Sequence, residues 1–353
     1  MKKRLIALCL SLTLCATALP AYAIAGSEDD PLISLSFLNT YKEQLLDELS
    51  ALLSPDDRSG KVVSEQLLLD QNRYKQEDLL IADTGAELIV LAGEVQVDPV
   101  NGVVIDATNG TETKRNAVLS TNSRYIVGED TTAVFTVLSP TAIVSCNGAV
   151  TISESDTPDY NAMADALKTL TLFKGTGSGI GEGYDLEKQP TRTEAIIMFI
   201  RLLGEEEAAL SCTAEHPFTD VLSWAEPYVA YAYEKGYTNG VGNQKFGSSR
   251  NITSKEYVEF VMRALEYSST EHTNLNDTLD NAVAVNLLTD AEHTLLSTST
   301  LLRSHVVYVS YYALSMPIAQ SKDTLEEKLL DNNVFNRAAL KAAHALVETD
   351  RML

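Results

Sequence analysis

Two arginines stand at the start of apolar runs whose spacing is typical of buried helices. Arg192 precedes a run from Ala195 to Leu203, and Arg303 precedes a similar run from Val306. A guanidinium in the first turn opposes the helix dipole by a few tenths of a kcal/mol unless an anion offsets it. A carboxylate ligand would meet helix amides and a guanidinium fork in one place, so these positions predict anion binding. The alternative left open is that Arg192 pairs with an acid of the same chain.

The residues beside these arginines predict how the helices begin. Thr191 with Glu194, and Thr253 with Glu256, fit the capping box, in which hydroxyl and carboxylate satisfy amides of the first turn. That role is structural. Lys255 could replace an arginine that the second run lacks, although a solvated lysine is the simpler interpretation.

Four other residues are candidates for a ligand site. Trp224, the single tryptophan, could stack on a sugar face, although core packing fits its place at a helix start better. Asp220 is expected to cap that helix rather than bind ligand. Gly175 and Gly240 stand in corresponding loops. The alternating glycines from Gly175 to Gly183 lack the order of a phosphate-binding loop and indicate a flexible insertion.

Other site chemistries find no support in the sequence. The five histidines lack metal-ligand spacing, and no nucleophile elbow or calcium loop is present. We therefore predict no catalytic residue, no metal and no cofactor. Cys146 and Cys212 could form a disulfide, but two cysteines are not a disulfide framework.

The first 23 residues have the pattern of a secretory signal peptide. Basic Lys2, Lys3 and Arg4 precede an apolar run, and Ala21-Tyr22-Ala23 resembles a cleavage site. The net charge of the whole chain is −22, and loss of the three basic residues would bring it near −25. Such acidity makes nucleic acid a poor partner. No other stretch is long and apolar enough to predict a membrane span, so we expect a secreted protein.

The helical part of the chain contains a repeat. Arg192 to Arg201 and Ser254 to Arg263 are the same distance apart, each within a helix-like run, and Arg303 opens a fainter third copy. Matched segments lie upstream of the three copies at 171–175, 236–240 and 286–290. Each helix, loop, helix unit is too small to bury its apolar face alone, so the three are expected to pack together.

The part of the chain ahead of the repeats has a different pattern of apolar residues. A helix is predicted over Ser36–Leu53, where apolar residues recur every three or four positions before Pro55. Short β-rich runs separated by turn residues follow and predict a small sandwich or roll. The predicted fold is multidomain α+β, with boundaries at 1–23 (signal), 24–78 (helical segment), 79–153 (β-rich domain), 154–159 (linker), 160–210, 211–270 and 271–318 (repeats) and 319–353 (helical tail).

The repeats resemble the S-layer homology family, whose copies open with Phe-x-Asp and Trp-Ala, pass a glycine-rich loop, and end in Ile-Thr-Arg-Ala-Glu at a helix start. The second copy carries most of this pattern: Phe218-Thr219-Asp220, Trp224-Ala225, Gly236, Gly240, Phe246 and Ile252-Thr253 with Glu256. The first copy supplies Pro190-Thr191-Arg192-Thr193-Glu194.

This resemblance implies a pseudo-threefold helical module that binds an anionic secondary cell-wall polymer, usually with pyruvylated sugars, and hence a location at the cell wall. The copies depart from the pattern at the arginine site. Ser254 replaces the arginine in the second copy, and His305 replaces the glutamate in the third. At most two of the three positions keep an arginine.

The functional hypothesis is a non-enzymatic cell-surface protein, anchored by the repeats, with the β-rich domain as a structural or adhesive module. Two alternatives remain. One is a secreted carbohydrate-active enzyme with catalysis in residues 28–155, and the other is a protein-interaction scaffold whose repeats no longer bind wall. The oligomeric state is not predicted.

Overall fold

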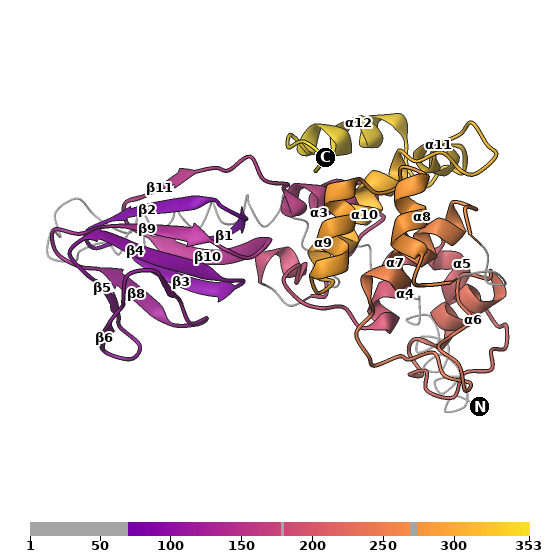
Figure 1. Cartoon of the computed structure of the whole chain (residues 1–353), viewed down its shortest axis with the longest axis horizontal. Helices are drawn as coiled ribbons and strands as arrows, with labels where there is room; N and C mark the ends of the chain where they lie inside the picture. Colours follow the sequence, from indigo (N-terminus) through magenta and orange to yellow (C-terminus); the bar gives the residue numbers. More distant parts are fainter. Residues whose placement is uncertain (1–69, 178–179, 269–273) are drawn as a thin grey trace, which may run out of the picture. The chain divides into compact units, whose positions relative to one another are not determined.

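The structure, a computed structural model, describes residues 70–177, 180–268 and 274–353. The predicted signal peptide and the predicted helix Ser36–Leu53 lie outside these residues. The described chain begins with strands and continues with helices (Figure 1), which confirms a mixed α+β class.

Eleven strands in the described residues form two antiparallel sheets. In spatial order the first contains β1 (Asp70–Lys75), β10 (Thr141–Asn147), β3 (Glu87–Ala92), β8 (Arg124–Val127), β5 (Val104–Asp106) and β6 (Thr111–Glu112). The second contains β11 (Val150–Ser153), β2 (Leu79–Asp83), β9 (Thr132–Val137), β4 (Val95–Asn101) and β7 (Ala117–Val118). The inward faces of both sheets share one core, as the alternating burial of β9 around Phe135 illustrates.

Strand β1 corrects one expectation. It lies within the segment 24–78, which was predicted to be helical. Its sequence is largely polar and only Tyr74 joins the core, so the strand depends on its antiparallel pairing with β10 rather than on an apolar alternation.

The predicted linker contains no helix or strand, yet it is held to the β-rich part. Ser155 donates its backbone N–H to Asp78 Oδ1 (2.8 Å) and its hydroxyl to the Gln76 carbonyl (2.6 Å). The chain therefore enters the helical part from a fixed point at the β1–β2 turn.

The helical part contains α3 (Tyr160–Thr169), the 3-10 turn η2 (Gly181–Gly183), α4 (Arg192–Leu202), α5 (Glu206–Leu210), α6 (Glu226–Glu234), α7 (Ser254–Ala264), α8 (Thr278–Ala284), α9 (Asp290–Thr298), α10 (Arg303–Leu314), α11 (Leu325–Asp331) and α12 (Arg337–Leu346). The paired helices of the three copies are α3 with α4, α6 with α7, and α8 with α10. The loop of the third copy contains the additional helix α9.

The first helix of each copy ends in the same way. Thr171, Gly236 and Asn286 take left-handed conformations, with φ of 63°, 71° and 62°. The next residue in each copy donates its N–H five residues back, which is the Schellman motif: Leu172 to Leu167, Tyr237 to Ala232 and Leu287 to Ala282. The three helix ends are thus equivalent in geometry as well as in sequence.

The second helices α4, α7 and α10 contact one another at the centre of the helical part. Each also contacts the first helix of another copy: α4 contacts α6, α7 contacts α8, and α10 contacts α3. Tyr257 of α7 is fully buried at this centre, with its hydroxyl 2.6 Å from Ser310 Oγ of α10.

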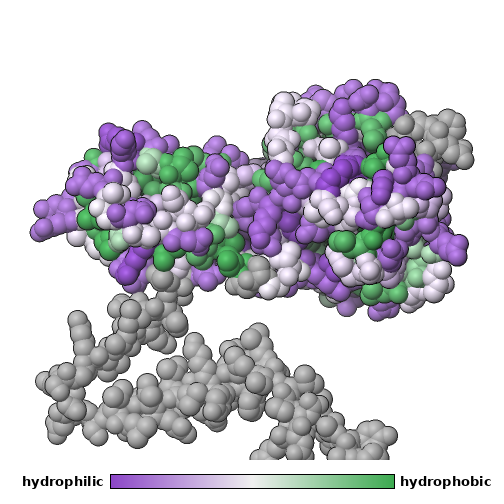
Figure 2. Space-filling view, turned by 90° about the horizontal axis from the view of Figure 1, so that it is seen from below, coloured by the Kyte–Doolittle hydropathy of each residue, from purple (hydrophilic) through white to green (hydrophobic). Residues whose placement is uncertain are grey.

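The exterior fits an acidic chain. On the face in Figure 2, hydrophilic residues predominate and the apolar ones form small, separate groups. Within the described residues, no helix has the length and apolar character needed to cross a bilayer.

The Tyr257 contact gives a stability prediction. Tyr257→Phe removes one buried hydrogen bond, while Ser310 keeps its bond to the Val306 carbonyl (2.6 Å). We expect the free energy of unfolding in urea to fall by about 1 kcal/mol. Tyr233→Phe, at a ring that is 38% exposed, is the control and should change nothing. Equal effects of both substitutions would contradict this account of the helical centre.

Candidate functional site

Arg192 is the first residue of α4, and its side chain is only 5% exposed. It lines a cavity of about 240 Å³ that is bounded by the loop after α6 and one face of α7. Its Nη2 donates to Thr238 Oγ1 (3.2 Å). Its Nη1 lies 3.1 Å from Glu256 Oε1 without hydrogen-bond alignment, and Nε has no hydrogen-bond partner.

The charges around this cavity favour an anion. Arg250 and Arg263 also line it, against the carboxylates Glu256 and Glu259, so three cations face two anions in a strongly acidic chain. Burial, together with the charges of Arg250 and Arg263, lowers the pKa of Arg192 to about 10 despite the attraction of Glu256. Arg192 therefore stays charged at neutral pH, and an anion would relieve the repulsion.

Apolar surface completes the Arg192 cavity. The guanidinium carbon lies 5.2 Å from the centre of the Phe246 ring and 5.0 Å from that of Phe260. Val241 and Leu275 line the cavity and are 44% and 40% exposed. The arrangement can accept a ligand with one negative group and an apolar face.

Arg303 occupies the matching position on α10 and is likewise buried. Its Nε donates to the Tyr184 carbonyl (2.9 Å), and its guanidinium carbon lies 5.9 Å from the centre of the Phe173 ring. Burial lowers the pKa of Arg303, with Glu194 and Asp185 acting in the opposite direction. This position repeats the Arg192 arrangement, with a cation beside an aromatic ring and the capping glutamate of the neighbouring copy.

Both predicted capping boxes are confirmed. Thr191 accepts from the Glu194 N–H (3.2 Å) and donates its own N–H to Glu194 Oε2 (2.7 Å), and the pair Thr253 and Glu256 has the same geometry. Glu256 thus both caps α7 and contributes a carboxylate to the Arg192 cavity.

The comparisons with known proteins agree with this geometry. The family model of the S-layer homology domain matches residues 217–258, from the loop before α6 into α7. The chain carries an S-layer homology domain. The match includes Gly240, Arg250 and Glu256 of the Arg192 cavity, while Arg192 itself comes from the preceding copy.

Two curated relatives of this chain are surface or wall proteins by name, and a third is an enzyme by name. A "Cell surface protein" of Thermoanaerobacter kivui is 26% identical over 57% of this chain and 26% of its own length. A "Middle cell wall protein" of Brevibacillus brevis is 27% identical over 38% of this chain and 13% of its own. An "Endoglucanase" of a Bacillus species is 33% identical over 23% of this chain and 8% of its own. The chain therefore spans about a quarter or less of each relative.

Among solved structures, procruciferin of Brassica napus aligns over 24% of this chain and 21% of its own at 18% identity. The TM-score of 0.17 is too low for a statement about fold.

The second and third copies each differ from the S-layer homology pattern at one charged position. Ser254 of α7 is buried where the other copies present arginine. His305 replaces the capping glutamate and does the same task, because its Nδ1 accepts from the Leu302 N–H (3.2 Å). Burial lowers the pKa of His305 to about 4.

The structure corrects two expectations about the S-layer homology domain. Trp224 is not a core anchor, because it is 58% exposed and α6 begins beyond it at Glu226. Asp220 does not cap α6. Its carboxylate accepts from the Phe246 and Gly247 N–H groups (2.7 and 2.9 Å), so it holds the loop before α7.

The remaining predicted residues have structural explanations. A Cβ on Gly240 would lie 2.4 Å from both the Lys245 carbonyl oxygen and the Phe218 ring, and one on Gly175 would lie 2.9 Å from two carbonyl oxygens. Lys255 is half-buried and does not line the Arg192 cavity. Cys146 and Cys212 are both free.

Sequence reasoning missed Arg250 and Arg263 as site residues. Arg263 follows Ser254 by the interval that separates Arg201 from Arg192, so the repeat register contained a signal for it. Arg250 stands in a loop that varies among the copies, and no comparable signal marked it.

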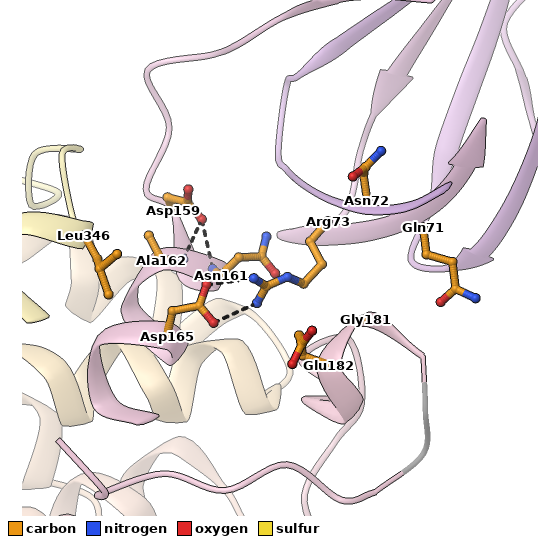
Figure 3. A pocket seen from close by; sticks show the side chains of 10 residues that line it. All are labelled: Gln71, Asn72, Arg73, Asp159, Asn161, Ala162, Asp165, Gly181, Glu182 and Leu346. Carbon is orange, nitrogen blue, oxygen red and sulfur yellow. Dashed lines mark hydrogen bonds and ion pairs between the residues drawn. The ribbon is translucent and has the colours of Figure 1, made fainter. Parts of the chain in front are cut away.

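A larger cavity, of about 560 Å³, lies between β1 and α3 (Figure 3). Arg73 binds both carboxylate oxygens of Asp165 (3.2 and 2.7 Å), and the Tyr184 hydroxyl donates to the same carboxylate (2.6 Å). Asp159 accepts from two amides at the start of α3. Because these charged groups satisfy one another, the Arg192 cavity is the better candidate. In the part of the chain that the structure describes, no cluster of three or more histidine, cysteine or acidic residues could hold a metal ion.

His305 gives a pH prediction. The unfolded histidine, with a pKa near 6.5, binds a proton that the folded one with a pKa of about 4 does not. Stability should therefore fall as the pH drops from 6.5 toward 4, by up to about 1.4 kcal/mol per pH unit. His305→Gln keeps an acceptor for the Leu302 N–H and should flatten this slope in urea unfolding.

The control for this measurement is His344→Gln, at a side chain that is 43% exposed. It should keep the wild-type slope. The same slope in the His305→Gln variant would contradict the buried neutral imidazole.

Proposed function

We propose that this chain is a non-enzymatic protein of the bacterial cell surface, held non-covalently on an anionic secondary cell-wall polymer through the positions of Arg192 and Arg303. One observation carries the proposal. The buried guanidinium of Arg192 has an unpartnered Nε and lines an open cavity that two further arginines share. The names of the surface and wall relatives support the same location.

We propose that residues 160–210, 211–270 and 271–318 are three S-layer homology-like repeats closed into a pseudo-threefold module. The cyclic contacts of α4 with α6, α7 with α8 and α10 with α3 support this arrangement, as do the three Schellman helix ends. Residues 1–23 would direct secretion, and the strands of residues 79–153 together with β1 would form a structural or adhesive domain.

The chemistry of the cavity favours a carboxylate on a sugar, such as a pyruvyl group. A carboxylate can accept a charge-assisted hydrogen bond from Arg192 Nε, which has no partner within the chain. The exposed edges of Val241 and Leu275 suit the apolar face of the sugar ring. Of the other residues that the sequence suggested, Trp224 stays a proposed contributor because its side chain is exposed.

Co-sedimentation with native wall sacculi tests the proposal. The full chain should bind, and removal of the secondary polymer should abolish binding. A charge-assisted hydrogen bond contributes about 1.5–3 kcal/mol, so Arg192→Ala should weaken binding by about 10-fold or more, and the pair Arg192→Ala and Arg303→Ala should weaken it further. Lys255→Ala is the control and should bind like the wild type.

Equal sedimentation with stripped walls would overturn the proposal. Arg192→Lys separates binding from folding, because it keeps the buried charge opposite Glu256 but removes the fork. This variant should melt near the wild-type temperature but bind native walls more weakly than the wild type. Turnover of a wall polymer by the full chain would contradict the non-enzymatic part of the proposal.

A further inference from the structure

The segment Val347–Met352, which follows α12, lies in an ordered path against the third copy. Met352 donates its N–H to the Tyr308 hydroxyl (3.1 Å), and Thr289 Oγ1 donates to the Met352 carbonyl (2.9 Å). Nearer α12, the Thr349 hydroxyl accepts from the Asp159 N–H (3.0 Å). The segment is therefore hydrogen-bonded through the Thr349 side chain and through the Met352 backbone, and α12 itself contacts α3.

Arg351 of this segment neutralises a buried carboxylate. Its Nε and Nη2 lie 2.6 and 2.7 Å from the two oxygens of Glu292, whose side chain is 1% exposed. The same carboxylate accepts from the Tyr308 hydroxyl (2.8 Å) and from the Thr289 N–H (2.9 Å). Without Arg351 it would be a buried anion with no cation beside it, which is strongly unfavourable.

Arg351 also donates to a backbone carbonyl whose counterpart in the second copy accepts from an arginine of α7. There Arg263 Nη1 donates to the carbonyl of Tyr237, the residue after the left-handed helix end. In the third copy Arg351 Nη2 donates to the carbonyl of Leu287, which is the equivalent residue (2.6 Å).

Helix α10 has no arginine at the position that corresponds to Arg263 of α7. Tyr312 stands where α7 has Arg263, and the Arg351 guanidinium carbon lies 4.6 Å from the centre of its ring. The segment thus supplies Arg351 as the donor to the Leu287 carbonyl, in place of a donor from α10.

The surface that receives the segment corresponds to the Arg192 cavity of the second copy. We call it the third groove, formed by Leu287, Thr289, Glu292, Tyr308 and Tyr312. Tyr308 stands where α7 has Glu259. Tyr160 packs against Tyr308, with ring centres 5.6 Å apart. The groove is lined by aromatic rings and one buried anion, so it suits a cationic peptide and not an acidic sugar.

We propose that the third groove is a peptide-binding site whose ligand is the segment Thr349–Met352 of the same chain, anchored by Arg351. The segment closes this groove, so wall polymer would have only the Arg192 and Arg303 positions. This contact lies within the chain and can be tested without the polymer. The result therefore does not depend on whether the chain binds the wall.

Hydrogen exchange followed by mass spectrometry tests the site in the full chain. In the wild type, the amide of Met352 and those of residues 286–292 should exchange slowly. In Arg351→Ala, both regions should exchange at least about 10-fold faster, while the amides of β9 stay unchanged. Arg337→Ala, at an exposed arginine of α12, is the matched control and should behave like the wild type.

A second variant separates docking from stability. Arg351→Ala with Glu292→Gln removes the uncompensated anion but keeps a capping side chain on α9, so it should melt above Arg351→Ala while Met352 still exchanges fast. Exchange of wild-type Met352 at the rate of an unstructured peptide would overturn the proposal, as would wild-type protection in Arg351→Ala.

Discussion

Charge buried at the starts of the second helices is the constraint on which the helical part depends. Each helix, loop, helix unit is too small for its own core, so α4, α7 and α10 pack together and their first turns are buried. A guanidinium there costs several kcal/mol unless an anion or hydrogen-bond acceptors lie beside it. Arg192 lies beside Glu256, and Arg303 donates to the Tyr184 carbonyl.

The three copies meet this constraint in different ways. In the second copy Arg250 shares Glu256 with Arg192, which leaves an excess of positive charge at the cavity and part of the guanidinium unused. The third copy has His305 in place of the capping glutamate and Tyr312 in place of Arg263. It contains instead a buried carboxylate, Glu292, that an arginine from elsewhere in the chain neutralises. The same scaffold therefore presents an excess of positive charge in one copy and an internally satisfied surface in another.

Local patterns predicted the repeat register, both capping boxes and the presence of a β-rich part, because each depends on residues near in sequence. Strand β1 was missed because its stability comes from pairing with β10, more than sixty residues away. The burial of Trp224 was predicted wrongly because burial depends on which neighbours cover a side chain. The periodicity of apolar residues in the sequence does not show those neighbours. Arg250 and Arg351 reach their partners through loops, whose paths follow from the whole fold.

The central claim is that the unused hydrogen-bonding capacity of Arg192 receives a carboxylate. A crystal structure of the chain with a pyruvylated sugar fragment tests it most directly. The account predicts a carboxylate oxygen within hydrogen-bond distance of Arg192 Nε, with the sugar ring against Val241 or Leu275. A fragment bound elsewhere, with the Arg192 cavity unchanged, would contradict it.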